Sequence, residues 1–212
     1  MAQLSGLLLI ELALHAAAFL CGIICASALS VTQGEFGGRC ILYGSVVYNG
    51  TLNLSSSSPV SLCYFVAVIS ALAAIFCFLS LLYGIYSACF GEEEPERVWL
   101  KGSIVLVAVV LFFLLISACI LRVGMDKLCA SIQKSAAASS CQEAQHRSWV
   151  PPYQGGRFYD NLYTAEAAAW VNFFFWCMLL LRLFVECMGK SSPRSSPGSD
   201  QPWNGERTPI IG

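Results

Sequence analysis

Three ionisable residues interrupt stretches of the chain that are otherwise apolar. Glu11 and His15 are four residues apart, so a helix would place both on one face, and Arg182 lies within the last apolar stretch. A carboxylate beside an imidazole can pass protons, and ionisable groups inside membrane helices commonly mark ion or proton pathways. Two structural alternatives stay open. Arg182 extends to the lipid headgroups while Glu11 sits at the interface, or Glu11 and Arg182 form an ion pair between the first and last helices.

The sequence holds no other arrangement of residues that is typical of catalysis or of a bound cofactor. It lacks the nucleophile-elbow, zinc-protease and phosphate-loop motifs. Cys21 and Cys25 would share a helix face, but no further ligand is close in sequence, so no metal site is predicted. A net charge of -1 gives no general attraction to nucleic acid. We therefore expect a protein that is not an enzyme, uses no cofactor and binds no nucleic acid.

The elements that position these residues are four long apolar segments. The chain has 212 residues, of which 57% are hydrophobic and only 12% are charged, whereas soluble domains carry about 25% charged residues. Crossing a bilayer as a helix takes roughly 20 apolar residues. The segments that qualify are residues 7–30, 62–90, 103–121 and 165–186. The predicted fold class is an all-α membrane protein, a four-transmembrane-helix bundle whose membrane domain spans residues 1–189.

The first apolar segment has an alternative interpretation as a secretory signal peptide. Ala26-Ser27-Ala28 resembles the small-residue site at which such peptides are cleaved. The segment lacks a positive charge at its start and is longer than the apolar region of a usual signal peptide. These two features favour a membrane-spanning helix.

The two longer connections, residues 31–61 and 122–164, carry features of a lumenal or extracellular compartment. Asn49 and Asn53 each begin an N-glycosylation sequon. The cysteines on this side of the membrane are Cys40, Cys63, Cys129 and Cys141. Four cysteines permit three pairings, and the lower entropy cost of short loops favours Cys40–Cys63 and Cys129–Cys141, with free thiols as the remaining alternative. We predict a small disulfide-stabilised cap over the helices.

The cap is expected to contain a β-hairpin. Asn49-Gly50 stands between two runs of β-forming residues, and both of its residues tolerate positive φ. A hairpin alone is marginally stable, so the disulfide and residues 122–164 would have to support it. The aromatic residues of the second connection, Trp149, Tyr153, Phe158 and Tyr159, form either part of a compact cap or the walls of a ligand groove.

Both chain termini and the connection 91–102 are then predicted to be cytosolic. Residues 190–212 are rich in Ser, Pro and Gly and are predicted to be a disordered cytosolic tail. Near its end, Glu206 precedes Ile210 and Ile211 with the spacing of an acidic dileucine sorting signal, a peptide that a sorting adaptor would bind. A chance match is the alternative. Cys89 and Cys187 fall at cytosolic helix ends, where S-palmitoylation occurs.

Several sequence landmarks together resemble one family of membrane proteins. They are TQGEFGGRC at 32–40, SLCYF at 61–65, SACILR at 117–122, CQEAQ at 141–145 and WVN at 170–172. Over about residues 11–177 they are similar to the transmembrane protein 179 family. The resemblance implies a four-pass membrane protein and brings no established activity, cofactor or catalytic residue. Claudin-type proteins share the general plan, but their first-loop tryptophan motif is absent here, so a junction-forming role is not expected.

These observations lead to a nonenzymatic multi-pass membrane protein. We expect it to be an accessory or trafficking partner of other membrane proteins, in contact with membrane lipids and located in the plasma membrane or in endolysosomal or granule membranes. The alternative is an oligomeric ion or proton channel or transporter that uses Glu11 and His15. Against conduction, the apolar segments show no internal repeat and add only a few polar residues that could line a pore, namely Ser70, Ser80, Ser117 and Asn172.

Overall fold

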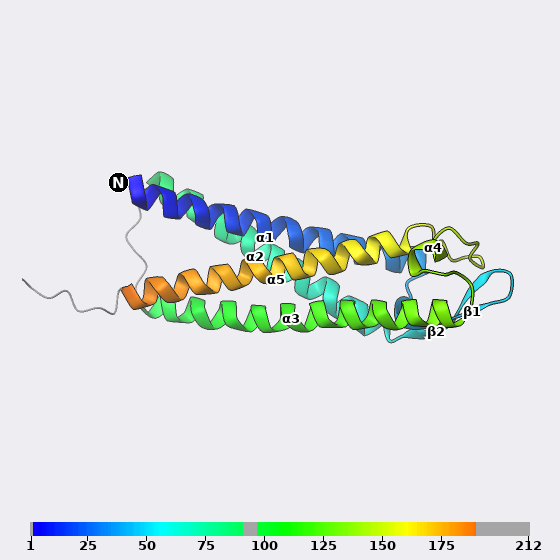
Figure 1. Cartoon of the computed structure of the whole chain (residues 1–212). Coiled ribbons are helices and arrows are strands. Elements are labelled where there is room, and N and C mark those ends of the chain that lie inside the picture. The colour runs from blue at the N-terminus through cyan, green and yellow to red at the C-terminus, as the bar shows by residue number, and fades with distance from the viewer. Residues whose placement is uncertain (1, 91–96, 190–212) are drawn as a thin grey trace, which may run out of the picture.

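The computed structural model describes residues 2–90 and 97–189 (Figure 1). The elements in chain order are α1 (Ala2–Glu35), β1 (Cys40–Tyr48), β2 (Leu52–Ser58), α2 (Val60–Phe90), α3 (Arg97–Lys134), α4 (Cys141–Ala144) and α5 (Phe158–Gly189). The predicted tail 190–212 and residues 91–96 of the predicted cytosolic connection lie outside the described part of the chain.

Four of the helices in the described part of the chain are long and apolar enough to cross a membrane. Their candidate spans are Gly6–Glu35, Val60–Phe90, Leu100–Lys134 and Phe158–Gly189. They run side by side, and a cap made of the hairpin, α4 and the connecting loops covers one end of the bundle (Figure 1). We call this the cap end; the other end, where α1 and α3 begin and α2 and α5 finish, is the base. The predicted class, a four-helix membrane protein with a hairpin-bearing cap, is confirmed.

The helices are longer than the apolar segments that predicted them. The largest difference is in α3, which continues to Lys134 although its apolar segment ends near 121. Beyond that point the helix becomes amphipathic: Met125, Leu128 and Ile132 are buried at spacings of three and four residues. Similarly, α5 begins at Phe158 rather than near 165. An apolar run marks only the part of a helix within the lipid, because the turns that continue into the cap are amphipathic.

Helix α1 packs closely on α2 because Gly22 leaves room for the α2 backbone. A Cβ atom at Gly22 would lie 2.8 Å from the Ser70 carbonyl oxygen and 3.0 Å from the Ala74 Cβ. Small residues that let helix backbones approach are a common feature of helix contacts in membranes.

Replacing Gly22 by alanine is therefore expected to destabilise the bundle by about 1–3 kcal/mol, because the two helices must separate to admit one methyl group. Thermal unfolding in detergent micelles measures the effect. The matched control is Gly34→Ala, since Gly34 is also helical but no other part of the described chain comes within 4 Å of the added Cβ. Alanine raises helix propensity equally at both positions. Equal melting temperatures for the two variants would contradict the close contact.

The cap is built on a two-stranded antiparallel hairpin formed by β1 and β2. Its turn contains Gly50 at a φ of +85°, which agrees with the predicted Asn49-Gly50 turn. Two other parts of the chain support it. The Val46 N–H donates to the Ser131 hydroxyl of α3 at 2.9 Å. On the β2 side, Leu52 exchanges backbone hydrogen bonds of 2.9 Å with Ser148 and Val150. The hairpin is thus held between α3 and the connection to α5.

Candidate functional site

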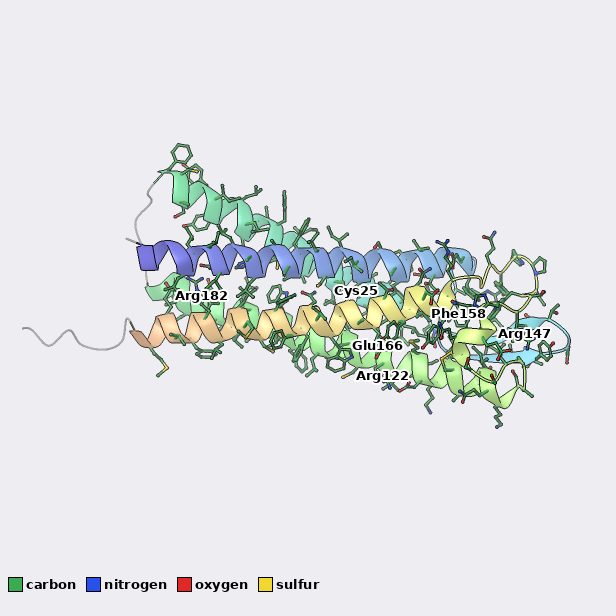
Figure 2. The ribbon with its side chains drawn as sticks, turned by 45° about the horizontal axis from the view of Figure 1, so that its top comes forward. Cys25, Arg122, Arg147, Phe158, Glu166 and Arg182 are labelled. Carbon is green, nitrogen blue, oxygen red and sulfur yellow. A yellow bond between two sulfur atoms is a disulfide. The ribbon has the colours of Figure 1, made fainter. Side chains whose placement is uncertain are left out.

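The charged residues predicted from sequence meet near the base of the bundle. Arg182 of α5 forms an ion pair with Glu11 of α1, and both side chains are mostly shielded, at 26% and 32% exposure (Figure 2). His15 is held by its own helix, with Nδ1 2.9 Å from the Glu11 backbone oxygen. Of the alternatives that the sequence left open, the geometry agrees with an ion pair that joins the first and last helices. Pairing offsets much of the cost of placing each charge in hydrocarbon.

A second ion pair joins α3 to α5 near the cap end. Arg122 lies 3.1 Å from Glu166 (Figure 2). It also lies 3.2 Å from Asp126, one turn along α3. The Glu166 side chain is 9% exposed, so it depends on this partner more than the half-exposed Arg122 does. Neither residue was expected from the sequence to form an ion pair. The one sequence signal for the pair is that each residue borders an apolar segment at the same predicted membrane face.

The four cysteines assigned to the cap form two disulfides in the favoured pairing. Cys40–Cys63 ties the start of β1 to the first turns of α2, with a Cα–Cα distance of 5.7 Å. Cys129–Cys141 ties α3 to α4, with a Cα–Cα distance of 5.1 Å. Each bond therefore fixes part of the cap directly to a membrane-spanning helix.

The predicted alternative of an aromatic ligand groove is wrong for two of its four members. Trp149 is 9% exposed and Phe158 is 0% exposed, and their rings lie 5.4 Å apart as part of the cap core. Phe36, directly after α1, packs edge-on against Trp149 with the ring centroids 5.1 Å apart. A Cβ at Gly155 would lie 2.2 Å from the Trp149 Nε1, so only glycine fits beneath the indole. These residues hold the cap together rather than lining an opening.

Helix α4 begins with an exposed network of hydrogen bonds. The Ser140 hydroxyl accepts from the Glu143 N–H at 3.2 Å, and the Glu143 carboxylate accepts from the Ser139 hydroxyl at 2.6 Å and from its N–H at 3.1 Å. These Ser139 contacts, with Arg147 at 2.9 Å, hold the pKa of Glu143 below its usual range. The network therefore stabilises α4 when Glu143 is ionised, and that contribution is lost as the pH falls through the lowered pKa.

Both predicted sequon asparagines are exposed on the hairpin. Asn49 stands at the turn, whereas Asn53 lies within β2 opposite Val47. An acceptor at an open turn is the easier of the two to modify, because its backbone is not held in the ladder.

We expect glycosylation at Asn49 when the protein is made in mammalian cells, seen as a gel-mobility shift that a glycosidase removes. Thr51→Ala should abolish the shift although Asn49 is retained, while Thr51→Ser, which keeps the sequon, should preserve it. A chain whose mobility is the same with and without glycosidase would contradict both the modification and the predicted placement of the cap.

The remaining predicted sites lie at the base or outside the described residues. Cys89 is exposed at the end of α2, and Cys187 is half-buried in the last turn of α5. Both positions are compatible with acylation at a membrane surface. The predicted sorting signal Glu206, Ile210 and Ile211 falls in the part that the structure does not describe. Within residues 2–90 and 97–189 no group of three or more His, Cys, Asp or Glu side chains could hold a metal ion.

The arrangement defines a class of protein: a four-helix membrane protein with a disulfide-linked hairpin over one end. The family model described as "Transmembrane protein 179/179B Claudin domain" matches residues 7–211. The chain therefore belongs to the transmembrane protein 179/179B family. The claudin domain in that description agrees with the four helices and the hairpin-bearing first connection.

Curated relatives cover nearly the whole chain. The chain is 44% identical over 211 residues to transmembrane protein 179B of Homo sapiens. That match covers 99% of this chain and 96% of the relative. It is 43% identical to transmembrane protein 179B of Danio rerio, over 92% of this chain and 90% of that protein. The Mus musculus protein of the same name is 42% identical, over 96% of this chain and 94% of that protein. No solved structure gives a significant match.

Proposed function

We propose that the protein is a nonenzymatic accessory or trafficking partner of other membrane proteins and that it binds a transmembrane helix of its partner in a groove between α1 and α2. The groove has a volume of about 570 Å³ and lies along the two candidate spans that pack on each other. Its lining includes Ala26, Ser27, Ser30, Ala71, Ala74 and Phe78. This groove is the observation that carries the proposal.

The residue types in the groove favour a helix as its occupant. Small side chains of both helices line part of it, Ala26 and Ser27 on α1 and Ala71 and Ala74 on α2. Phe19 and Phe78, whose rings lie 5.5 Å apart, line another part. Helix pairs in membranes associate through such surfaces because the backbones can approach closely and gain van der Waals contact. Ile23 and Ile75, which are 45% and 54% exposed, add branched side chains to the same groove. A lipid acyl chain is the competing occupant.

Site-specific photo-crosslinking tests the proposal. A photoreactive amino acid at Ala26 should give one discrete protein adduct in intact membranes, and Ala71→Phe, which fills the groove, should abolish that adduct. The matched control is Val105→Phe, since Val105 is 64% exposed on α3, away from the groove, and should leave the adduct unchanged. Lipid adducts alone, or a protein adduct that survives Ala71→Phe, would overturn the assignment of a partner helix.

The contacts of Glu11 support a structural role for it over the alternative of ion or proton conduction. Its carboxylate is engaged by Arg182, and His15 bonds to the backbone of the same helix. Purified protein in liposomes separates the two functions. Proton or cation flux that disappears in Glu11→Gln would favour transport, whereas equal flux in protein-containing and empty liposomes would favour the accessory role.

The proposed orientation places the cap in the lumen or outside the cell and both termini in the cytosol. Disulfides form in oxidising compartments, and the sequons lie on the same cap. In this orientation the sequence around Glu206, Ile210 and Ile211 can reach cytosolic adaptors, and Cys89 and Cys187 lie at the cytosolic face.

Replacing both Ile210 and Ile211 by alanine is expected to shift the protein from endolysosomal membranes toward the cell surface. An acidic dileucine signal needs its aliphatic pair to fill an apolar pocket on the adaptor. Surface biotinylation measures the shift, and Thr208→Ala, within the same segment, serves as the control. Unchanged surface exposure of the double variant would argue against the sorting signal.

A further inference from the structure

Three buried polar side chains in the middle of the bundle have no hydrogen-bond partner within residues 2–90 and 97–189. Asn172 is 1% exposed, and neither its amide oxygen nor its amide nitrogen has a hydrogen-bond partner among the described residues. The same holds for the Ser117 hydroxyl at 1% exposure and for the Trp176 indole N–H at 0%. Leaving such a group unsatisfied in an apolar interior is costly, and a bilayer offers no bulk water to compensate.

The Arg122–Glu166 ion pair places Ser117 and Asn172 at similar depths in the bundle. It fixes the register of the antiparallel helices α3 and α5 (Figure 2). Toward the base, Ser117 is five residues from Arg122 and Asn172 is six residues from Glu166. At about 1.5 Å per residue these separations are roughly 8 Å and 9 Å. Trp176 follows Asn172 by four residues, so its indole lies one turn nearer the base on the same face of α5.

Ser117 and Asn172 lie at a depth that separates the two apolar clusters of the bundle. Ala118 and Ala169 belong to the cluster on the cap side. Leu114 and Trp176 belong to the cluster on the base side. Ser117 and Asn172 therefore fall at the boundary between them. The buried polar pair on the other two helices is satisfied, because the Ser70 hydroxyl donates to the Cys25 sulfur at 3.4 Å.

The chemistry of these groups selects a small neutral ligand. Lipids and partner helices cannot reach side chains that are 1% exposed or less. A metal cation would need about six oxygen ligands. The depth of Ser117 and Asn172 offers two, the amide oxygen of Asn172 and the hydroxyl of Ser117. The amide and the hydroxyl donate and accept hydrogen bonds, and the indole donates. Water matches this mixture, since a buried water makes about three hydrogen bonds to groups that lack other partners.

We propose that Asn172 and Ser117 bind internal water between α3 and α5, with the Trp176 N–H at the base side of the same site. The proposal does not depend on a partner helix in the α1–α2 groove. The bound water satisfies the amide and the hydroxyl within the lipid layer and fixes the contact between the two helices at this depth.

Water-to-protein magnetisation transfer tests the site on the full chain in lipid nanodiscs. The expected result is transfer from water to the Asn172 side-chain amide and to the Trp176 indole proton. Trp149 is the internal control: it is also buried, but its N–H donates to the Ala144 carbonyl at 3.3 Å and should show little transfer. In Asn172→Leu, transfer to Trp176 should fall to the level of Trp149.

Two results would overturn the proposal. The first is an absence of transfer to both Asn172 and Trp176 in the natural chain, a measurement that needs no variant to fold. The second is transfer to Trp176 that persists in a folded Asn172→Leu variant, because water would then reach the indole without the amide. Ser117→Ala should reduce the transfer to Asn172 while leaving Trp149 unchanged.

Discussion

Replacing Arg182 by methionine is expected to lower the free energy of unfolding by about 2–3 kcal/mol. Breaking a fully buried ion pair costs about 3–5 kcal/mol, because the remaining charge stays desolvated without a partner. We expect a smaller loss here because Glu11 stands five residues from the start of its candidate span, close enough to the membrane surface for a freed charged side chain to reach the headgroups. Methionine keeps much of the apolar stem of arginine, so the loss reports on the charge.

A double-mutant cycle isolates this interaction. The variants are Arg182→Met, Glu11→Leu and the two together, compared by reversible denaturation in mixed micelles. We expect the double variant to be more stable than Arg182→Met alone, because removing both charges relieves the unpaired carboxylate. Lys127→Met, at an exposed position on α3, is the control for loss of a surface charge. If the two single effects simply add, the residues are not coupled and the ion pair does not stabilise the bundle.

The sequence was sufficient to predict features that depend on local composition. Long apolar segments predict spans because a helix in lipid must satisfy its backbone internally. Asn49-Gly50 predicts the hairpin because both residues tolerate positive φ, and Gly50 does adopt it. The Cys40–Cys63 pairing followed from a short loop and a shared compartment.

Features that depend on packing between distant segments could not be predicted in this way. Trp149 and Phe158 are separated in sequence from Phe36, and nothing local shows that the three rings meet inside the cap. The same is true of Arg122 and Glu166, whose contact is set by the relative register of α3 and α5. Asn172 was visible as a polar residue in an apolar segment, but its burial without a protein partner was not.

Removing the Cys40–Cys63 disulfide in the double variant Cys40→Ser/Cys63→Ser is expected to lower the free energy of unfolding by about 3 kcal/mol. The bond closes a loop with a sequence separation of 23 residues, and the chain-entropy relation for a loop of that length gives about this value. Two further effects act in the same direction. Cys40 and Cys63 are 0% and 1% exposed, so each serine places a hydroxyl in the cap core. The hairpin also loses its covalent link to α2, and an isolated hairpin is marginal.

The loss of stability should be confined to the cap. Limited proteolysis should cut within residues 40–58 of the double variant, while the membrane-spanning helices stay protected. The second bond, Cys129–Cys141, has a sequence separation of 12, so its removal should cost about 0.5 kcal/mol less by the same relation. Cys119→Ser, at an exposed unpaired cysteine of α3, is the control for the exchange of sulfur for oxygen. A hairpin that stays protected without Cys40–Cys63 would mean that its contacts with α3 and with residues 148–150 suffice to hold it.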